Sequence, residues 1–266
     1  MPLATINGRE IYYEQHGEGE EWITLLNGVT MNTAGWMLQV PDFAKHFRVL
    51  LLDFCGQGKS AMPQEASYPL ERQSDDLAAL LDHLGIARTH VLGISYGGVV
   101  AQQFVLRHRA RVNKLVLVDT LACSDAVTAA LWESLVQAQA AGGHHLRFVT
   151  MLPMAFGSRF LEIAAKMIPA MEASESQVPW HAVTALSEAL RGLDMRPHYP
   201  GFNVETLVMV GDEDRFTPPY QARMIANGIP GAKLRILPGV GHASTFENPP
   251  LVNQTALSFL LGTMTD

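Results

Sequence analysis

The sequence has only two cysteines, Cys55 and Cys123, in 266 residues. So few cysteines exclude a disulfide-dense secreted scaffold, and we interpret both as reduced thiols. Basic residues are also scarce, because 19 Lys and Arg stand against 26 Asp and Glu, which gives a net charge of -7. This balance argues against a protein that binds nucleic acid, which needs a basic face.

Long hydrophobic runs are missing as well. No uncharged apolar stretch reaches about 18 residues, so we expect no transmembrane helix. The N-terminus has no basic segment followed by an apolar one, so we expect no signal peptide and a cytoplasmic location. Metal-ligand spacings such as His-x-x-x-His and Cys-x-x-Cys are absent, so we expect no metal and no cofactor. Hydrophobic residues make up 48% and charged residues 17%, which is typical of a folded globular protein.

Short apolar runs alternate with longer segments of helical periodicity. The short runs are rich in Val, Ile and Leu, as is typical of strands buried on both faces. We expect strands at Trp22–Leu26, Arg48–Asp53, His90–Ile94, Lys114–Asp119, Glu205–Val210 and Lys233–Leu237. We expect helices at Glu71–Leu84, Gly97–His108, Pro219–Asn227 and Pro249–Leu261. This alternation predicts βαβ units and a mostly parallel sheet.

The first two strands follow a different pattern. Ala4–Ile6 and Arg9–Glu14 flank an Asn7-Gly8 pair, which is a strong signal for a tight hairpin. We therefore expect the sheet to open with an antiparallel hairpin at one edge.

The segment from Leu121 to Arg196 contains no strand pattern. It is rich in Ala and Met and broken by glycines and prolines, which predicts several helices inserted between two strands. We expect a core of residues 1–120 and 197–266 with a helical cap of residues 121–196. Apolar side chains of the insert either form its own small core or line an apolar pocket beneath a lid. The residues that we expect to line such a pocket are Met151, Met154, Phe156, Phe160 and Trp180.

A G-x-S-x-G motif at Gly93–Gly97 lies between a predicted strand and a predicted helix. In this setting the serine sits in a strained turn with its hydroxyl exposed, and side chains at positions 93 and 97 would collide with backbone. The motif predicts Ser95 as a nucleophile. The alternative is an ordinary glycine-rich turn.

A serine nucleophile needs a base, and His242 follows the last predicted strand in the segment Gly239–His242. We predict that His242 is this base; the alternative is a histidine of a surface loop. The other nine histidines are interpreted as surface or packing residues, and among them only His144 and His145 of the insert stay open as site residues.

An acid is expected to orient the base, and three carboxylates follow the strand after the insert. Asp212 leaves the strand too early and Glu213 is expected to face solvent, whereas Asp214 stands far enough round the turn to point toward His242. We therefore favour Asp214, with Asp119 at the end of an earlier strand as the reserve candidate.

An oxyanion hole requires backbone N–H groups near the serine. The strand Trp22–Leu26 ends in an Asn27-Gly28 pair, which allows the backbone to turn close to the site. We assign the oxyanion hole to the N–H groups of Val29 and Tyr96. The alternative is a tight turn without a role.

These motifs together resemble the α/β-hydrolase fold superfamily over nearly the whole chain. The matching segments are Asn27-Gly28, Asp53–Ser60, the Ser95 turn, Gly211–Asp214 and Gly241-His242. The resemblance implies a mostly parallel eight-stranded sheet flanked by helices, with a helical cap inserted. Two positions depart from the family pattern, since Asn27 replaces the usual His and Cys55 the usual Arg. Both departures concern packing around the oxyanion loop and not the triad.

The resemblance implies a cofactor-free serine hydrolase that acts on a small carboxylic ester or lactone through an acyl-enzyme. In size and motif order the chain is similar to enol-lactone hydrolases, and the segments Asn27-Gly28 and Gly56–Ser60 are locally similar to the synthase that joins 3-hydroxyacyl chains in rhamnolipid assembly. Acyl transfer and perhydrolysis use the same triad. From another class, some proteins of this fold are ligand receptors without turnover. Whether the protein forms a homodimer is left open.

Overall fold

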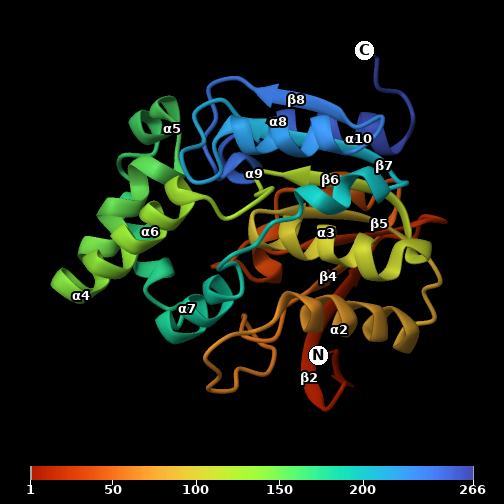
Figure 1. Cartoon of the computed structure of the whole chain (residues 1–266), viewed down its shortest axis with the longest axis horizontal. Coiled ribbons are helices and arrows are strands. Elements are labelled where there is room, and N and C mark those ends of the chain that lie inside the picture. Colours follow the sequence, from red (N-terminus) through yellow and green to blue (C-terminus); the bar gives the residue numbers. More distant parts are fainter. Residues whose placement is uncertain (1, 266) are drawn as a thin grey trace.

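An eight-stranded sheet runs through the computed structural model, which describes residues 2–265 (Figure 1). The strand order is β1-β2-β4-β3-β5-β6-β7-β8, with β1, β2 and β4 paired antiparallel and all other neighbours parallel. The predicted hairpin and the mostly parallel sheet are confirmed. The strands are β1 Leu3–Ile6, β2 Arg9–His16, β3 Trp22–Leu26, β4 Arg48–Leu52, β5 Thr89–Ile94, β6 Val112–Val118, β7 Glu205–Gly211 and β8 Lys233–Leu237.

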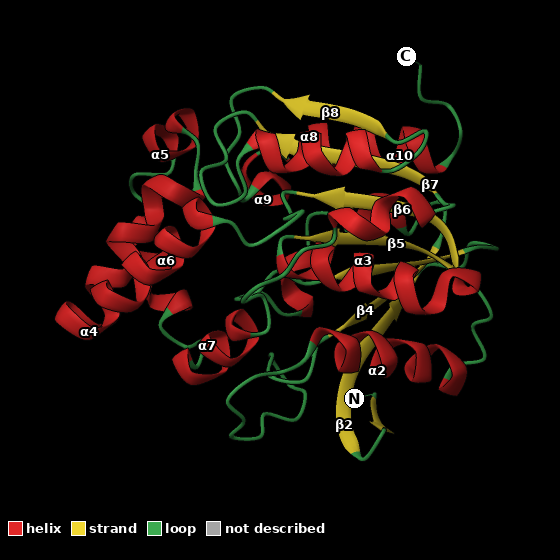
Figure 2. Cartoon of the chain, in the orientation of Figure 1, coloured by secondary structure: helices red, strands yellow, loops and turns green. Residues whose placement is uncertain are grey.

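Helices cover both faces of the sheet. The buried side chains of α2, α3 and α8 share one hydrophobic core with the sheet, and those of α1 and α10 share another. Figure 2 shows α2, α3 and α8 as a layer in front of the strands. The helices of these two layers are α1 Val40–Phe43, α2 Leu70–His83, α3 Tyr96–His108, α8 Pro219–Gly228 and α10 Pro249–Leu260. The four helices predicted along the sheet are therefore confirmed.

Four further helices fill the segment between β6 and β7, at the end of the sheet toward which the arrowheads of β6 and β8 point (Figure 1). They are α4 Ala126–Ala155, α5 Ser158–Ile163, α6 Ile168–Glu175 and α7 Trp180–Glu188. Helix α4 is broken at Gly142 and Gly143, where Gly143 adopts a φ of 65°. The two ends of the insert meet in an isolated β-bridge between Cys123 and Asp194.

The parallel strands place several loops at one edge of the sheet, because the carboxyl ends of parallel strands lie together. The loop after β3 begins at Asn27, the turn after β5 holds Ser95, and the loop after β7 holds Asp214. These are the positions that the sequence motifs occupy. The functional loops and the inserted helices therefore lie at the same end of the sheet.

Within residues 2–265, no helix has the length and apolar character needed to cross a bilayer. Cys55 and Cys123 are both buried free thiols, as expected from the sequence.

Candidate active site

Ser95 occupies a sharp turn between β5 and α3. Its backbone adopts a φ of 52° and a ψ of -118°, a region that side-chain-bearing residues rarely occupy. A Cβ atom at position 97 would lie 2.2 Å from the carbonyl oxygen of Leu26, and one at position 93 would lie 2.4 Å from that of Gly97. The prediction that only glycine fits at Gly93 and Gly97 is confirmed.

A continuous chain of hydrogen bonds joins Ser95 to His242 and His242 to Asp214, and we call these three residues the Ser95 row. The Oγ atom of Ser95 lies 3.0 Å from Nε2 of His242, and Nδ1 of His242 lies 2.9 Å from Oδ2 of Asp214. Asp214 is fixed by three donors, since Oδ1 accepts from the backbone N–H groups of Phe216 and Thr217 and Oδ2 accepts from the Thr217 hydroxyl at 2.6 Å. The sequence reasoning missed Thr217, whose only signal is a hydroxyl in the turn that holds the acid.

The charges of this row stabilise each other. Burial by itself lowers the pKa of His242, but the adjacent Asp214 carboxylate outweighs it and holds the pKa above its usual value. Burial likewise raises the pKa of Asp214, but the His242 ring and the hydrogen bonds to Thr217 outweigh that effect and lower it. The arrangement therefore favours a carboxylate at Asp214 and an imidazole that accepts a proton readily.

The two other carboxylates after β7 have different partners. Asp212 accepts a hydrogen bond from the backbone of Gly239 at 2.7 Å. Glu213 accepts from the backbone and the hydroxyl of Ser158 in the insert. Neither carboxylate bonds to His242 among the contacts of the described residues.

Asp119, the reserve candidate, is fully buried at the end of β6, and its φ is 44°. Its Oδ1 accepts from the backbone of Gly211, whereas its Oδ2 has no hydrogen-bond partner within the described chain. Burial, together with the charge of Asp214, raises the pKa of Asp119 to about 8. Asp119 is therefore a buried carboxyl group that favours its protonated form and lies close enough to Asp214 and His242 to interact with their charges.

The loop after β3 approaches Ser95 at Gly28, where a Cβ atom would lie 3.7 Å from the Cβ of Ser95. The Gln57 side chain donates to the carbonyl of Gly28 at 2.8 Å. The N–H of Val29 belongs to the same trans peptide and so points away from Gln57. Tyr96 is the first residue of α3, so its N–H has no acceptor within the helix. Gln57, which the sequence reasoning did not single out, thus orients a peptide beside the serine.

The two departures from the family pattern are both buried. Asn27 accepts from the Trp36 indole at 2.8 Å and donates to the carbonyl of Leu52 at 2.9 Å, which ties the loop after β3 to the end of β4. The Cys55 thiol lies 3.0 Å from the Arg9 guanidinium. Neither side chain bonds to the Ser95 row among the described contacts, so both stabilise the structure around the site and do not contact the reacting groups.

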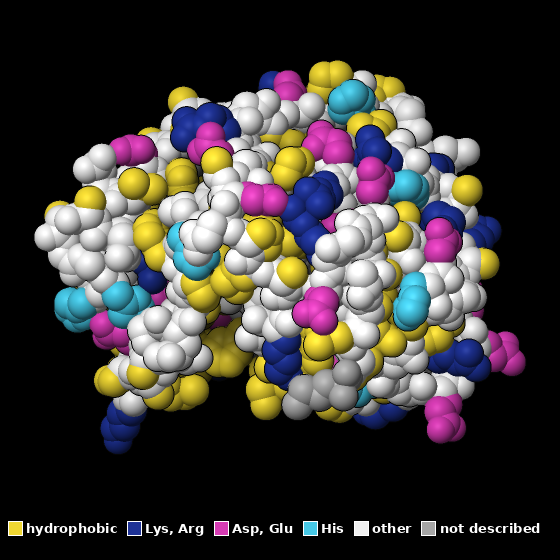
Figure 3. Space-filling view, turned by 90° about the horizontal axis from the view of Figure 1, so that it is seen from below, with side chains coloured by type: hydrophobic (Ala, Val, Ile, Leu, Met, Phe, Trp, Pro, Cys, Tyr) yellow, Lys and Arg dark blue, Asp and Glu magenta, His cyan; other side chains and the backbone are white. Residues whose placement is uncertain are grey.

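A cavity of about 460 Å³ opens above Ser95 and His242 and is walled largely by the insert. Of the residues expected there, Met151, Phe156 and Trp180 line it. Seen from below, hydrophobic side chains gather in a hollow between the inserted helices and the rest of the molecule (Figure 3).

Met154 and Phe160, which were also expected there, are not among the residues that line this cavity. The Phe160 ring stacks on Phe156 at 5.0 Å between ring centres and belongs to a small core within the insert. The carbonyl of Met154 accepts from the backbone of Arg215, which fixes that segment against the loop after β7.

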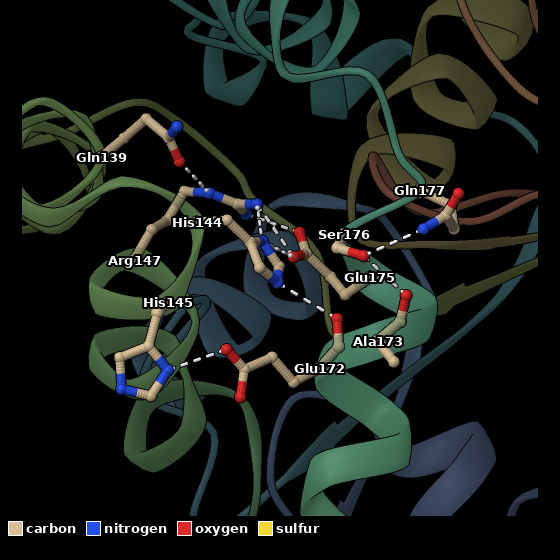
Figure 4. Close-up of polar contacts among 9 residues, drawn as sticks. All are labelled: Gln139, His144, His145, Arg147, Glu172, Ala173, Glu175, Ser176 and Gln177. Atoms are coloured by element: carbon tan, nitrogen blue, oxygen red, sulfur yellow. Dashed lines mark hydrogen bonds and ion pairs between the residues drawn. The ribbon is translucent and has the colours of Figure 1, made fainter.

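A buried guanidinium, that of Arg147, forms part of the cavity wall. Figure 4 shows its hydrogen bonds to Gln139, His144 and Glu175. It pairs with both carboxylate oxygens of Glu175, at 2.5 and 2.8 Å, and lies 4.5 Å from the ring centre of Trp180. The other lining cation, Arg191, pairs with Glu188 at 2.6 Å. Both positive charges of the wall are therefore compensated within the protein.

His144 and His145 belong to α4, and their side chains reach toward α6 (Figure 4). Neither is among the residues that line the cavity. His144 lies 3.0 Å from Glu175, and His145 lies 2.8 Å from Glu172. Both histidines thus connect helices of the insert and take no part in the Ser95 row. Among residues 2–265 there is no group of three or more His, Cys, Asp or Glu side chains arranged to hold a metal.

The fold and the serine turn define the class of protein. The model of the family described as alpha/beta hydrolase fold matches residues 21–249, and the chain belongs to this family.

Solved and curated relatives cover nearly the whole chain. The enol-lactonase from Burkholderia xenovorans LB400 is 30% identical, with a TM-score of 0.89 over 98% of this chain and 100% of that one. A thermophilic esterase from Thermogutta terrifontis is 26% identical, with a TM-score of 0.86 over 99% of each chain. A protein of Azorhizobium caulinodans, provisionally named carbamate hydrolase RutD, is 27% identical over 97% of this chain and 98% of its own length. All three relatives are named as hydrolases.

Proposed function

We propose that this protein is a cofactor-free serine hydrolase that acts on carboxylic esters or lactones. The observation that carries the proposal is the hydrogen-bonded row from Asp214 through His242 to Ser95, which opens into an apolar cavity. The relatives named enol-lactonase and esterase support the same bond type.

The geometry suits a two-step acyl transfer. Nε2 of His242 takes the proton of Ser95 as Oγ attacks the carbonyl carbon, and the N–H groups of Val29 and Tyr96 hold the resulting oxyanion. The protonated His242 then gives its proton to the leaving alkoxide, which leaves an acyl ester on Ser95. In the second step His242 removes a proton from water, the hydroxide attacks the acyl ester, and the acid departs as Ser95 regains its proton. Asp214 stabilises the imidazolium in both steps.

In this proposal residues 121–196 act as a cap on a core of residues 1–120 and 197–266. The support is that the insert contributes Met151, Phe156 and Trp180 to the wall above Ser95. The cap excludes water and selects the acyl group.

A panel of p-nitrophenyl esters and γ-lactones tests the proposed function, with Ser95→Ala as the blank. A burst of p-nitrophenol followed by steady turnover is expected, because acylation precedes hydrolysis. A ligand receptor of this fold binds the esters without turnover, and that result contradicts the proposal. If added alcohol changes the product from the acid to a new ester, the enzyme transfers acyl groups to alcohols. If added hydrogen peroxide changes the product to a peracid, the enzyme carries out perhydrolysis.

The length of the acyl chain is expected to control kcat/KM. Each added CH₂ that is buried in the cavity should raise kcat/KM by up to about fourfold, which corresponds to about 0.8 kcal/mol, until the cavity is full. Charged acyl groups should react poorly, because the wall cations Arg147 and Arg191 already have partners and a further charge would be desolvated. The measurement is kcat/KM for linear esters from C2 to C8. No dependence on length, or a dianionic ester as the best substrate, would contradict an apolar pocket.

The rate is expected to rise with pH, because only a neutral His242 accepts the proton of Ser95. The ring is protonated below its pKa and neutral above it. Since Asp214 holds the pKa of His242 above its usual value, the half-maximal rate should lie above about pH 6.5. The profiles of kcat and kcat/KM from pH 5 to 9 check this expectation. Flat profiles would contradict the assignment of His242 as the base.

A further inference from the structure

The loop that carries His242 is tied to the insert by one carboxylate, that of Glu247. Glu247 ends the short helix α9 (Ser244–Glu247), and its side chain reaches back to the backbone that precedes His242. Oε1 accepts from the backbone N–H of Gly241 at 3.0 Å, and Oε2 accepts from the backbone N–H of Gly157 at 2.9 Å. Gly241 precedes His242, whereas Gly157 joins α4 to α5. A single side chain thus connects two segments that lie far apart in the sequence.

The insert also contacts the residue on the other side of His242. The backbone N–H of Ala243 donates to the carbonyl of Ala155 at 3.0 Å. The packing leaves no space between the segments, since a Cβ atom at Gly241 would lie 2.6 Å from the backbone nitrogen of Gly157. His242 is therefore flanked on both sides by backbone that is fixed to the insert.

We infer that Glu247 is a positioning residue, which holds the His242 ring at the distance from Ser95 that proton transfer requires. This inference rests on the proposed function, because its effect is transmitted through His242. In this view the insert has two roles, since it forms a wall of the pocket and also holds the loop that carries His242 in place. A carboxylate suits the task, because each of its two oxygens accepts from a different N–H group, whereas in glutamine one of these two positions becomes an NH₂ group that donates.

Glu247 is also one of three carboxyl groups whose charges raise the pKa of His242, together with Asp214 and Asp119. Asp214 contributes most of the three, since it bonds directly to the ring. Removal of the Glu247 charge should lower the pKa of His242, which provides a readout beyond stability.

The test is Glu247→Gln, with Glu213→Gln as the matched control. Glu213 accepts from the backbone and hydroxyl of Ser158 in the same part of the insert, but its side chain does not bond to the His242 loop among the described contacts. Glu247→Gln should lower kcat for a p-nitrophenyl ester by about ten- to a hundredfold with little change in KM, since small displacements of a catalytic group have effects of this size. It should also move the pH of half-maximal kcat downward. Glu213→Gln should leave both quantities near those of the wild type.

Three results separate the possibilities. If Glu247→Gln keeps the wild-type kcat and pH profile while Ser95→Ala is inactive, the positioning role is wrong and the proposed function stands. If Ser95→Ala keeps its activity, the proposed function itself is wrong. If Glu247→Gln does not fold, Glu247→Asp replaces it, because Asp keeps both oxygens and the charge but is one CH₂ too short to reach both N–H groups. An intermediate kcat for Glu247→Asp supports the inference, and a wild-type kcat overturns it.

Discussion

Ser95→Ala is expected to reduce ester turnover by about 10⁶-fold, the order of loss seen when a triad serine is removed. The physical reason is that Oγ of Ser95, 3.0 Å from Nε2 of His242, forms the bond to the acyl group. The fold should survive, because the hydroxyl at 95 forms no other hydrogen bond within the described chain and alanine adopts the same backbone angles about as well as serine. The measurements are kcat with a p-nitrophenyl ester and the Tm of both proteins.

Ser176→Ala provides a matched control for this substitution. Ser176 lies exposed at the end of α6, where its hydroxyl donates to the carbonyl of Ala173 (Figure 4). Its replacement removes the same atom without touching the cavity, so turnover should stay at the wild-type rate. Activity of Ser95→Ala above a few per cent of wild type would end the covalent mechanism.

Asp214→Asn is expected to lower kcat by about 10⁴-fold, as the loss of an orienting carboxylate does in other triads. The amide removes the negative charge that stabilises the His242 cation and can present an N–H to Nδ1 in place of an acceptor. Because the backbone N–H groups of Phe216 and Thr217 still find an oxygen, the loop should keep its shape. The measurement is kcat at pH 7 together with Tm.

Asp119→Asn and Asp212→Asn are the controls for this second substitution. Burial and the charge of Asp214 hold the pKa of Asp119 well above its usual value, so its neutral form is favoured and asparagine is a close replacement. Among residues 2–265, the hydrogen bond of the Asp212 side chain goes to the backbone of Gly239, away from His242. Both variants should keep most of the activity. A crippling effect of Asp212→Asn or Asp119→Asn, with a mild effect of Asp214→Asn, would show that the acid is misassigned.

The sequence could predict the sheet and the three residues of the row because their signals are local. Ser95 follows directly on a buried parallel strand, Asp214 stands three residues past the end of another, and His242 follows the last strand after a short turn. A glycine stands close to each of them, at Gly93, Gly211 and Gly241. The rule that parallel strands share their carboxyl edge then brings these positions together.

The wall of the cavity could not be predicted in the same way. Helix α4 is broken at Gly142 and Gly143, so the face that each later side chain presents depends on how the two halves pack. Met151 lines the cavity, whereas Phe160, which is just as apolar, packs against Phe156 and Phe246 and does not. Composition alone does not separate these two environments.

Contacts between segments that lie far apart in the sequence could not be predicted either. Gln57 orients the peptide of Gly28 from the loop after β4, and Glu247 bonds to Gly157 across the junction with the insert. Neither residue belongs to a spacing pattern with its partner. Only the folded chain shows which polar side chains hold the loops in place.

The identity of the nucleophile is the central claim, and reaction with a fluorophosphonate tests it most directly. Oγ of Ser95 should attack phosphorus, with fluoride leaving and a stable phosphonyl ester remaining on the serine. Intact mass should show one adduct per chain, and peptide mapping should place it on Ser95, with no adduct on Ser95→Ala and complete loss of esterase activity on labelling. An adduct at another residue, or an unlabelled Ser95 in a chain that has lost its activity, would contradict the account.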